Sequence, residues 1–533
     1  MLVSMSVDIR KMVKDKLFKD VIRLDNKRKI LVVDNDGMRV LSDCFKMSEL
    51  FEEKIILIED LFKRREKIKN IDALYLVKPT ENVINIMISD FKLIQKSKKK
   101  FKEDLMYKSA NIYFLSQCSD SCLEQLSANH IVKYIKTLKE MNLSFKPIQS
   151  HVFGVDQLET SLGIASFCLN LGIYPFLRFH SDFAQSAEFC YRIEQNLDEF
   201  MKTDLSLGIE SDSHLLILDR SFDLLTPLLH ELTFEAMISE NEEELEKLQQ
   251  NDEDEIWNEV RHLHIAEVID RIHGKMKNTK KIEVFGTIRE FGKTMKNIKN
   301  MEKLEKYITL TEKLLESYKT DLIDIITLEQ DMSTGFTSEN VPIRDGRIVQ
   351  NLTKILMDKN VSENYRLRLI LIYMLCLPEK IEDYYLKMVE VSGFSDDGID
   401  VVRNMLQLYK SSQPCMMPRR KLPSEYQFNT SRWIPHICDI IKSVHDGSLD
   451  TERFRCLGKQ PSRKTAVSSA RFGSLENRAN KKIVIFIAGG ITYSEIREAY
   501  KFSNTLKNTQ IFIGSDRILT PNNFIEHYLR NKF

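Results

Sequence analysis

Short apolar runs alternate with stretches of helical pattern along the first third of the chain, and this alternation constrains the fold more than any other feature. The four runs read ILVV, IILI, LYLV and IYFL, and they occupy Ile30–Val33, Ile55–Ile58, Leu74–Val77 and Ile112–Leu115. Runs of this length suit buried strands, and strands separated by crossover helices form a parallel, doubly wound sheet. We therefore predict an N-terminal α/β domain.

The α/β pattern returns twice and is interrupted by a long helical region. Leu215–Leu218 is a predicted strand, and a strand, a helix and a strand are predicted at Ile483–Ile487, Tyr493–Phe502 and Ile511–Ile513. Between them lie an acidic stretch from Glu240 to Glu255, an amphipathic helical face from Leu304 to Ile326 and a polar loop from Arg455 to Asn480. The predicted fold is α/β plus α, with two parallel-sheet α/β domains and a large helical domain inserted in the second. The predicted limits are 1–142 for the first domain, 143–238 and 481–533 for the second, and 239–480 for the insertion.

Charge and composition narrow the function classes. The 533 residues include 78 basic and 78 acidic side chains, and this balance argues against a dedicated nucleic-acid binder. The longest apolar run, Leu369–Leu377, is about half the length that spans a bilayer. The nine cysteines show no zinc-ligand spacing, which predicts reduced thiols in the cytosol and no metal site. The basic run KSKKKFK at Lys96–Lys102 is predicted to be a solvated loop, with contact to anionic lipid as the alternative.

One motif invites an enzymatic interpretation. The stretch LVVDNDGM, Leu31–Met38, places Asp34 and Asp36 directly after a strand. In a metal-dependent phosphohydrolase one such carboxylate attacks phosphorus and the other handles the proton, with Mg²⁺ bridging. The alternative is a strand-to-helix turn, where Asp and Gly are favoured for backbone reasons. We favour the turn.

A second stretch carries a family resemblance. LLILDRSFDLLTPLLHELTFEAM, Leu215–Met237, resembles the signature of the SM (Sec/Munc) family of SNARE regulators in its order of Asp-Arg-x-Phe-Asp, Thr-Pro, Leu-His-Glu and Thr-Phe-x-Ala-Met. Further segments that resemble the family are Lys29–Ile68, Ile135–Phe153, Asp254–Val268, Ser431–Ile441 and Ile483–Tyr500. The resemblance covers nearly the whole chain, and its first region is most similar to the plasma-membrane, exocytic branch.

The resemblance implies a fold, a function and partners. The family forms an arch of two α/β domains with a helical domain inserted in the second, and it has no known catalytic chemistry and no cofactor. It implies a monomeric cytoplasmic protein that binds a syntaxin-type SNARE and the assembled SNARE bundle. Such a protein chaperones syntaxin, regulates SNARE assembly in docking, fusion and exocytosis, and reaches the plasma membrane or transport vesicles through SNAREs. The competing classes are a phosphohydrolase and a vesicle-tethering scaffold. A phosphohydrolase would turn over a phosphoester in the presence of Mg²⁺. A pull-down with syntaxin alone separates a tethering scaffold from an SM protein.

The resemblance also assigns site residues. The syntaxin-binding inner face matches Asp34, Met38, Arg39, Lys46, Glu59, Lys63 and Arg64. The pocket for the syntaxin N-terminal peptide matches Leu123, Ile135, Leu138 and Glu140. Leu123 stands where family members often have Phe, and the first three residues equally suit the cores of two amphipathic helices. A hairpin switch is expected at Asp345 and Gly346, where exocytic members carry Asp-Pro.

Overall fold

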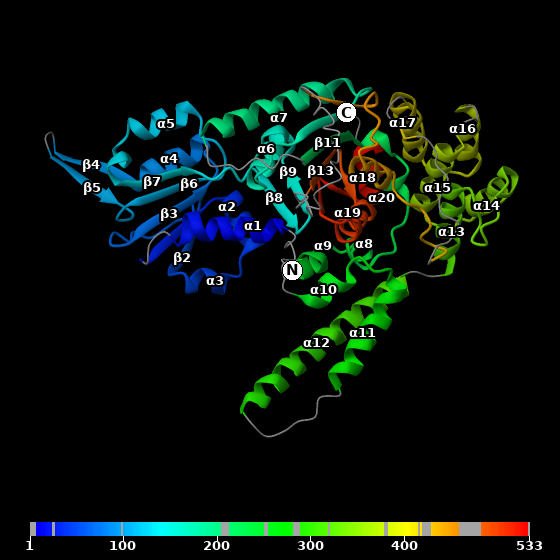
Figure 1. Cartoon of the computed structure of the whole chain (residues 1–533), viewed down its shortest axis with the longest axis horizontal. Helices are drawn as coiled ribbons and strands as arrows, with labels where there is room; N and C mark the ends of the chain where they lie inside the picture. Colours follow the sequence, from blue (N-terminus) through cyan, green and yellow to red (C-terminus); the bar gives the residue numbers. More distant parts are fainter. Residues whose placement is uncertain are drawn as a thin grey trace, which may run out of the picture. The chain divides into compact units, whose positions relative to one another are not determined.

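The chain forms two compact units. The computed structural model describes residues 7–530 except 24–26, 98–99, 204–212, 250–253, 281–287, 318–319, 378–381, 414–415, 418–427 and 458–480. Unit 1 comprises Met1–Leu218, Asp450–Ile487 and Ser503–Asp516, and unit 2 comprises Asp219–Leu449, Ala488–Phe502 and Arg517–Phe533. The labels in Figure 1 follow the chain through both units.

Unit 1 contains a five-stranded parallel sheet in the order β2-β1-β3-β6-β7. Each of the four N-terminal apolar runs lies in one of its strands, so those predictions are confirmed. The edge strand β7 was not predicted, because its alternating sequence IKTLKE is short and half-exposed. The strands are β1 (Lys29–Val33), β2 (Ile55–Asp60), β3 (Asp72–Val77), β6 (Ala110–Phe114) and β7 (Ile135–Glu140).

Side-chain caps begin the helices that accompany this sheet. The side chains of Asp34, Thr80 and Ser119 accept hydrogen bonds from backbone N–H groups in the first turns of α2, α4 and α5. Gly37 has a steric role, since a Cβ there would lie 2.2 Å from the carbonyl oxygen of Leu76. The helices are α1 (Ile9–Leu17), α2 (Asn35–Cys44), α3 (Met47–Glu52), α4 (Glu81–Asp90) and α5 (Asp120–Ser127).

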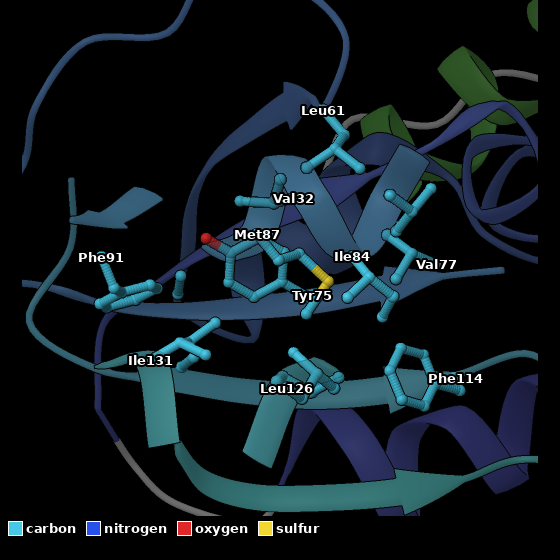
Figure 2. Close-up of a cluster of buried hydrophobic side chains, with 14 of the residues drawn as sticks. Val32, Leu61, Tyr75, Val77, Ile84, Met87, Phe91, Phe114, Leu126 and Ile131 are labelled. Carbon is cyan, nitrogen blue, oxygen red and sulfur yellow. The ribbon is translucent and has the colours of Figure 1, made fainter. Parts of the chain in front are cut away.

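The core of this part of unit 1 lies between the sheet and the helices α4 and α5. Figure 2 shows Val32, Tyr75 and Phe114 from the sheet facing side chains of the helices, among them Ile84 and Leu126. All of these side chains are almost fully buried. Burial of each large apolar side chain contributes about 1.5–3 kcal/mol, which anchors the sheet.

The basic run between α4 and β6 is part of a β-hairpin. β4 (Phe91–Ser97) pairs antiparallel with β5 (Lys100–Leu105), and residues 98–99 lie outside the described residues. The prediction of a loop at Lys96–Lys102 was therefore wrong for the strand residues.

A seven-stranded sheet, also in unit 1, has the order β12-β10-β11-β13-β15-β9-β8. The C-terminal strands β13 and β15 pair in parallel, and β15 pairs in parallel with β9, which confirms that the late α/β segment returns to a sheet begun much earlier. The outer strands β8 and β12 run antiparallel to their neighbours. Helices α6 (Thr160–Asn170) and α7 (Ala184–Thr203) contact each other beside this sheet. The strands are β8 (Phe145–Gln149), β9 (Val152–Val155), β10 (Phe176–His180), β11 (Ser213–Asp219), β12 (Phe454–Cys456), β13 (Lys481–Ala488) and β15 (Thr509–Ser515).

Unit 2 is mainly helical. The predicted amphipathic face from Leu304 to Ile326 lies on two helices, α12 (Ile288–Ser317) and α13 (Thr320–Thr334). Leu304 and Ile326 are buried, whereas Leu315 is exposed. Figure 1 shows α11 and α12 as an antiparallel pair. Tyr318 and most of the predicted polar loop, 458–480, lie outside the described residues. Among the described helices none is long and apolar enough to cross a membrane.

The elements of unit 2 begin with two short 3₁₀ turns and end with a π-helical turn. They are η4 (Arg220–Phe222), η5 (Thr226–Leu228), α8 (Phe234–Ile238), α9 (Glu242–Gln249), α10 (Glu255–Val260), α11 (Ile265–Lys280), α12 (Ile288–Ser317), α13 (Thr320–Thr334), α14 (Asp345–Met357), α15 (Glu363–Cys376), α16 (Glu382–Val391), α17 (Asp396–Ser412), α18 (Ile437–Asp446), β14 (Ile491–Thr492), α19 (Tyr493–Thr505), β16 (Ile518–Leu519), α20 (Pro521–Ile525) and η6 (Glu526–Arg530).

Candidate functional site

The edge strand β2 and the preceding helix α3 expose an unusual number of large apolar side chains. A group of large, exposed apolar side chains on a protein surface often marks an interaction site. Phe51 is 54% exposed and Phe62 is 48% exposed. The full set is Met47 and Phe51 on α3, Ile56 and Leu57 on β2, and Phe62 just after β2. The sequence predicted the run IILI as a strand but gave no sign that these side chains are exposed, because the edge position of β2 is visible only in the folded sheet.

Four of the predicted inner-face residues lie in the same segment. Lys46 immediately precedes α3, Glu59 lies on β2, and Lys63 and Arg64 follow that strand. Lys63 is largely exposed and lies 3.3 Å from the carboxylate of Asp60. We call the exposed apolar residues together with these four charged residues the α3–β2 face.

The other three predicted inner-face residues belong to the start of α2. Asp34 is buried, and its two carboxylate oxygens accept hydrogen bonds from the N–H groups of Gly37 and Lys78 at 2.8 and 2.7 Å. Asp34 is therefore a buried capping residue, and its place on the syntaxin-binding face stays a prediction. Met38 is half-buried, and Arg39 is exposed with its guanidinium 3.6 Å from Asp36.

A buried polar network lies behind Glu59. The guanidinium of Arg65 donates to both carboxylate oxygens of Asp90 at 2.8 and 3.0 Å and to the Tyr107 hydroxyl at 3.2 Å. The hydroxyl of Tyr75 donates to Asp90, and that of Tyr107 donates to Glu59. Burial alone would lower the pKa of Arg65, but the hydrogen bonds and charge of Asp90 outweigh it and raise that pKa. The network therefore holds one carboxylate oxygen of Glu59 in place through the Tyr107 hydroxyl.

The predicted N-peptide residues lie at the opposite edge of the same sheet. Leu123 is on α5, whereas Ile135, Leu138 and Glu140 are on β7, so the alternative of a second amphipathic helix was wrong. Leu138 is 42% exposed, and Leu123 and Ile135 are half-buried. The carboxylate of Glu140 accepts a hydrogen bond from the Cys118 N–H at 2.7 Å, which ties the β7 edge to the start of α5.

The carboxylates of the phosphohydrolase interpretation are not arranged for that chemistry. A nucleophilic or metal-binding Asp needs an accessible ionised oxygen. Both oxygens of Asp34 are occupied by backbone N–H groups, and burial raises the pKa of this carboxyl. In the described part of the chain, no three His, Cys, Asp or Glu side chains are grouped to hold a metal ion. The geometry instead agrees with the strand-to-helix turn.

The Asp-Arg-x-Phe-Asp signature is an internal brace of unit 2. The guanidinium of Arg220 donates to both carboxylate oxygens of Glu495 on α19, each at 2.9 Å, and both side chains are fully buried. Asp223 accepts hydrogen bonds from the N–H and hydroxyl of Thr226 and from the N–H of His436. The Asp-Arg-x-Phe-Asp part of the motif therefore stabilises the fold.

The predicted hairpin residues Asp345 and Gly346 form the first turn of α14. The connection from α13 is closed by hydrogen bonds from the Ile343 N–H to the Gly335 carbonyl and from the Thr337 N–H to the Val341 carbonyl. Gly346 is exposed, and a Cβ there would meet no atom within 4 Å. The bend between α13 and α14 thus precedes Asp345 and includes Pro342.

Comparisons with known proteins agree with this architecture. The profile of the Sec1 family matches residues 29–527. The chain is 26% identical to "Protein transport protein sec1" of Dictyostelium discoideum, over 99% of this chain and 100% of that protein. It is 24% identical to the "SNARE-interacting protein KEULE" of Arabidopsis thaliana, over 93% of this chain and 91% of that protein.

Solved structures show the same fold. The Unc18–syntaxin 1 complex from Monosiga brevicollis matches with a TM-score of 0.81 and 21% identity, over 98% of this chain and 99% of that chain. The SM protein Vps45 in complex with the Qa SNARE Tlg2 matches with a TM-score of 0.76 and 17% identity, over 97% of each chain. Because the family profile spans nearly the whole sequence, the chain belongs to the Sec1 family of SM proteins.

Proposed function

We propose that this chain binds a syntaxin-type SNARE and regulates SNARE assembly during vesicle docking and fusion, and that the α3–β2 face is its first contact with syntaxin. The observation that supports this proposal is a set of exposed apolar side chains on α3, on β2 and just after β2. They lie among the charged residues Lys46, Glu59, Lys63 and Arg64. The solved relatives support it, since one is a complex with syntaxin 1 and another is a complex with the Qa SNARE Tlg2.

The composition of the α3–β2 face suits a helical partner. Interfaces combine an apolar centre with a polar rim, and complementary charges on the rim set specificity and association rate. A SNARE helix offers apolar residues on one side and charged ridges beside them. Phe51 and Phe62 would bury against the helix, while Lys46 and Glu59, charges of opposite sign, would fix its register.

Replacing Phe51 and Phe62 with serine is expected to weaken syntaxin binding about 30-fold. Together the two rings would lose about 2 kcal/mol of apolar burial in the complex, and 1.4 kcal/mol corresponds to a factor of ten. The dissociation constant is measured by calorimetry against a panel of plasma-membrane, endosomal and Golgi syntaxins. We expect the tightest binding to a plasma-membrane syntaxin, in keeping with the exocytic branch.

The matched control is Tyr191→Ser, which removes an equally exposed aromatic ring from α7 in the same unit. This variant should bind as the wild type does. The charge-reversed pair Lys46→Glu with Glu59→Lys should also bind more weakly and with an altered salt dependence. If the wild-type chain bound no syntaxin, a tethering scaffold would become the better interpretation; equal affinity of all variants would remove the α3–β2 face from the interface.

We further propose that the β7 edge holds the syntaxin N-terminal peptide, with Leu138 as the exposed apolar contact. Its position on the sheet edge opposite β2 supports this assignment. A structural relative, Sly1p, was solved in complex with an N-terminal peptide of Sed5p, which gives a precedent for such a contact. This second contact leaves the α3–β2 face free for the helical part of the same SNARE.

The connection between α13 and α14 is proposed to act as a switch during SNARE assembly. Gly346→Ala is expected to speed SNARE-dependent liposome fusion about fivefold, because Ala favours a helix by about 1 kcal/mol over Gly and so favours extension of α14 toward α13. Gly346→Pro is expected to slow fusion. Proline fits the first turn of α14 without loss of a helical hydrogen bond, yet it opposes a helix that continues through this position.

The control for this prediction is Gly274→Ala, a helical glycine on α11 where a Cβ also meets no atom within 4 Å. It gains the same helix propensity without touching the connection. All three variants should keep the wild-type affinity for syntaxin alone. Equal fusion rates for the wild type and both Gly346 variants would contradict the switch.

A further inference from the structure

A large polar pocket lies within unit 2. Its volume is about 830 Å³, which is within the range of pockets that hold ligands. Its walls come from the segment that follows η5, from the first turns of α15, α19 and α20, and from the residues after α8. The residues of the α3–β2 face and of the β7 edge do not line it, whereas Thr226 of the Arg220 brace does.

The charged groups of the pocket carry an excess of carboxylates. Glu231 and Glu240 both line it, and Arg368 is the lining residue of opposite sign. Arg368 is already paired with Glu329 at 2.9 Å, and the cation beside Glu231, Arg497, is shared with Glu498. Burial raises the pKa values of both Glu231 and Glu240, and the charges of Arg497 and Arg368, respectively, partly oppose this rise. A phosphate-rich ligand would be repelled by such walls, whereas an ammonium or guanidinium group would be attracted.

A second observation comes from Arg368 itself. This side chain is 4% exposed, and its Nε and Nη2 atoms donate to Glu329. Its Nη1 atom has no hydrogen-bond partner among the described residues, and Arg368 lines the pocket. An arginine N–H group that faces an open pocket can donate to a bound acceptor, so a ligand carbonyl fits at this point.

The uncharged walls match peptide groups. The amide side chains of Asn241, Asn364, Asn522 and Asn523 line the pocket, and each can donate and accept hydrogen bonds. A peptide group likewise offers one donor and one acceptor.

We propose that this pocket binds a short extended peptide segment carrying a lysine or arginine side chain. The basic group lies between Glu231 and Glu240, a backbone carbonyl accepts from Nη1 of Arg368, and the asparagine amides bind the flanking peptide groups. The pocket would give the chain a docking site for a basic linear segment of a partner, separate from its SNARE contacts.

The test uses the full chain and the acetylated pentapeptide amide Gly-Ser-Lys-Ser-Gly, with norleucine and glutamate versions of the central residue as comparisons. Affinity is measured by ligand-detected NMR titration. The lysine peptide is expected to bind at least about tenfold more tightly than the norleucine peptide, since a hydrogen bond to a charged group accounts for that difference. The glutamate peptide should bind most weakly.

Two variants locate the binding. Glu240→Gln removes one pocket charge and should weaken the lysine peptide about tenfold, while Glu390→Gln, an exposed carboxyl on α16 outside the pocket, should not. Asn522→Trp should block the pocket and weaken all peptides. Equal binding of the lysine and norleucine peptides, preference for glutamate, or indifference to Glu240→Gln would overturn the proposal. Binding of phosphoethanolamine without binding of any peptide would also overturn it and would point to a lipid headgroup. Syntaxin affinity of the same variants is measured in parallel, so a failure here is distinguishable from a failure of the SNARE proposal.

Discussion

Replacing Arg220 with alanine is expected to lower the free energy of unfolding of unit 2 by about 3–5 kcal/mol. The reason is that Glu495 is fully buried and would lose both hydrogen bonds from the guanidinium, so the variant would leave an uncompensated charge in the interior. Arg220 also donates to the carbonyl oxygens of Asp223 and Gly490, which would lose a donor. A loss of this size is a large fraction of the stability of an ordinary domain.

Urea unfolding followed by tryptophan fluorescence measures this loss, because both tryptophans of the chain, Trp257 and Trp433, lie in unit 2. Arg403→Ala is the matched control: its salt bridge to Asp400 is exposed, and such pairs contribute at most about 1 kcal/mol. The double variant Arg220→Met with Glu495→Met should recover much of the loss, since it removes both charges together. A single Arg220→Ala variant no less stable than Arg403→Ala would show that the brace does not stabilise the unit.

Asp90→Ala is expected to destabilise the five-stranded sheet by a similar amount, about 3–5 kcal/mol. The change leaves the buried guanidinium of Arg65 without its carboxylate and the Tyr75 hydroxyl without its acceptor. Hydrogen exchange of amides in β3 reports the loss within unit 1. Glu188→Ala, which breaks the exposed pair with Arg192 on α7, is the control and should change exchange little.

Tyr107→Phe tests the link between this network and the α3–β2 face. It removes the hydroxyl between Arg65 and Glu59 and should cost about 0.5–1.5 kcal/mol of stability. We expect syntaxin affinity to fall as well, because Glu59 would lose the donor that orients it. If β3 amides of Asp90→Ala exchanged at wild-type rates, the buried pair would have no stabilising role. If Tyr107→Phe bound syntaxin with wild-type affinity, the network would contribute to stability but not to syntaxin binding.

The elements with strong local patterns were the ones that the sequence predicted. ILVV and IVIFI became the buried strands β1 and β13 because a continuous apolar run is buried on both faces of a parallel sheet. The edge strands β7, β8 and β12 were missed, since a half-exposed strand has a weak, short alternation. The basic hairpin of β4 and β5 was missed because lysine runs usually indicate solvated loops.

The candidate site could be predicted only in part. The family resemblance located Lys46, Glu59, Lys63 and Arg64 on one segment, but it also included Asp34, whose carboxylate the structure uses to cap α2. The exposure of Phe51 and Phe62 has no local signature, because the same residues would be core side chains if another element covered α3 and β2.

The sequence by itself determined the apolar runs that became β1, β3, β11 and β13 and the membership of a family, both of which depend on neighbours within a few residues or on a colinear match. The tertiary structure decided which partners meet across long distances in the chain. Arg220 pairs with Glu495, 275 residues away, and His230 meets Glu329, 99 residues away. The polar pocket likewise forms from segments near residues 230, 365, 493 and 522. Such encounters depend on how whole elements pack, and periodicity along the chain carries no information about which distant side chains will share a buried space.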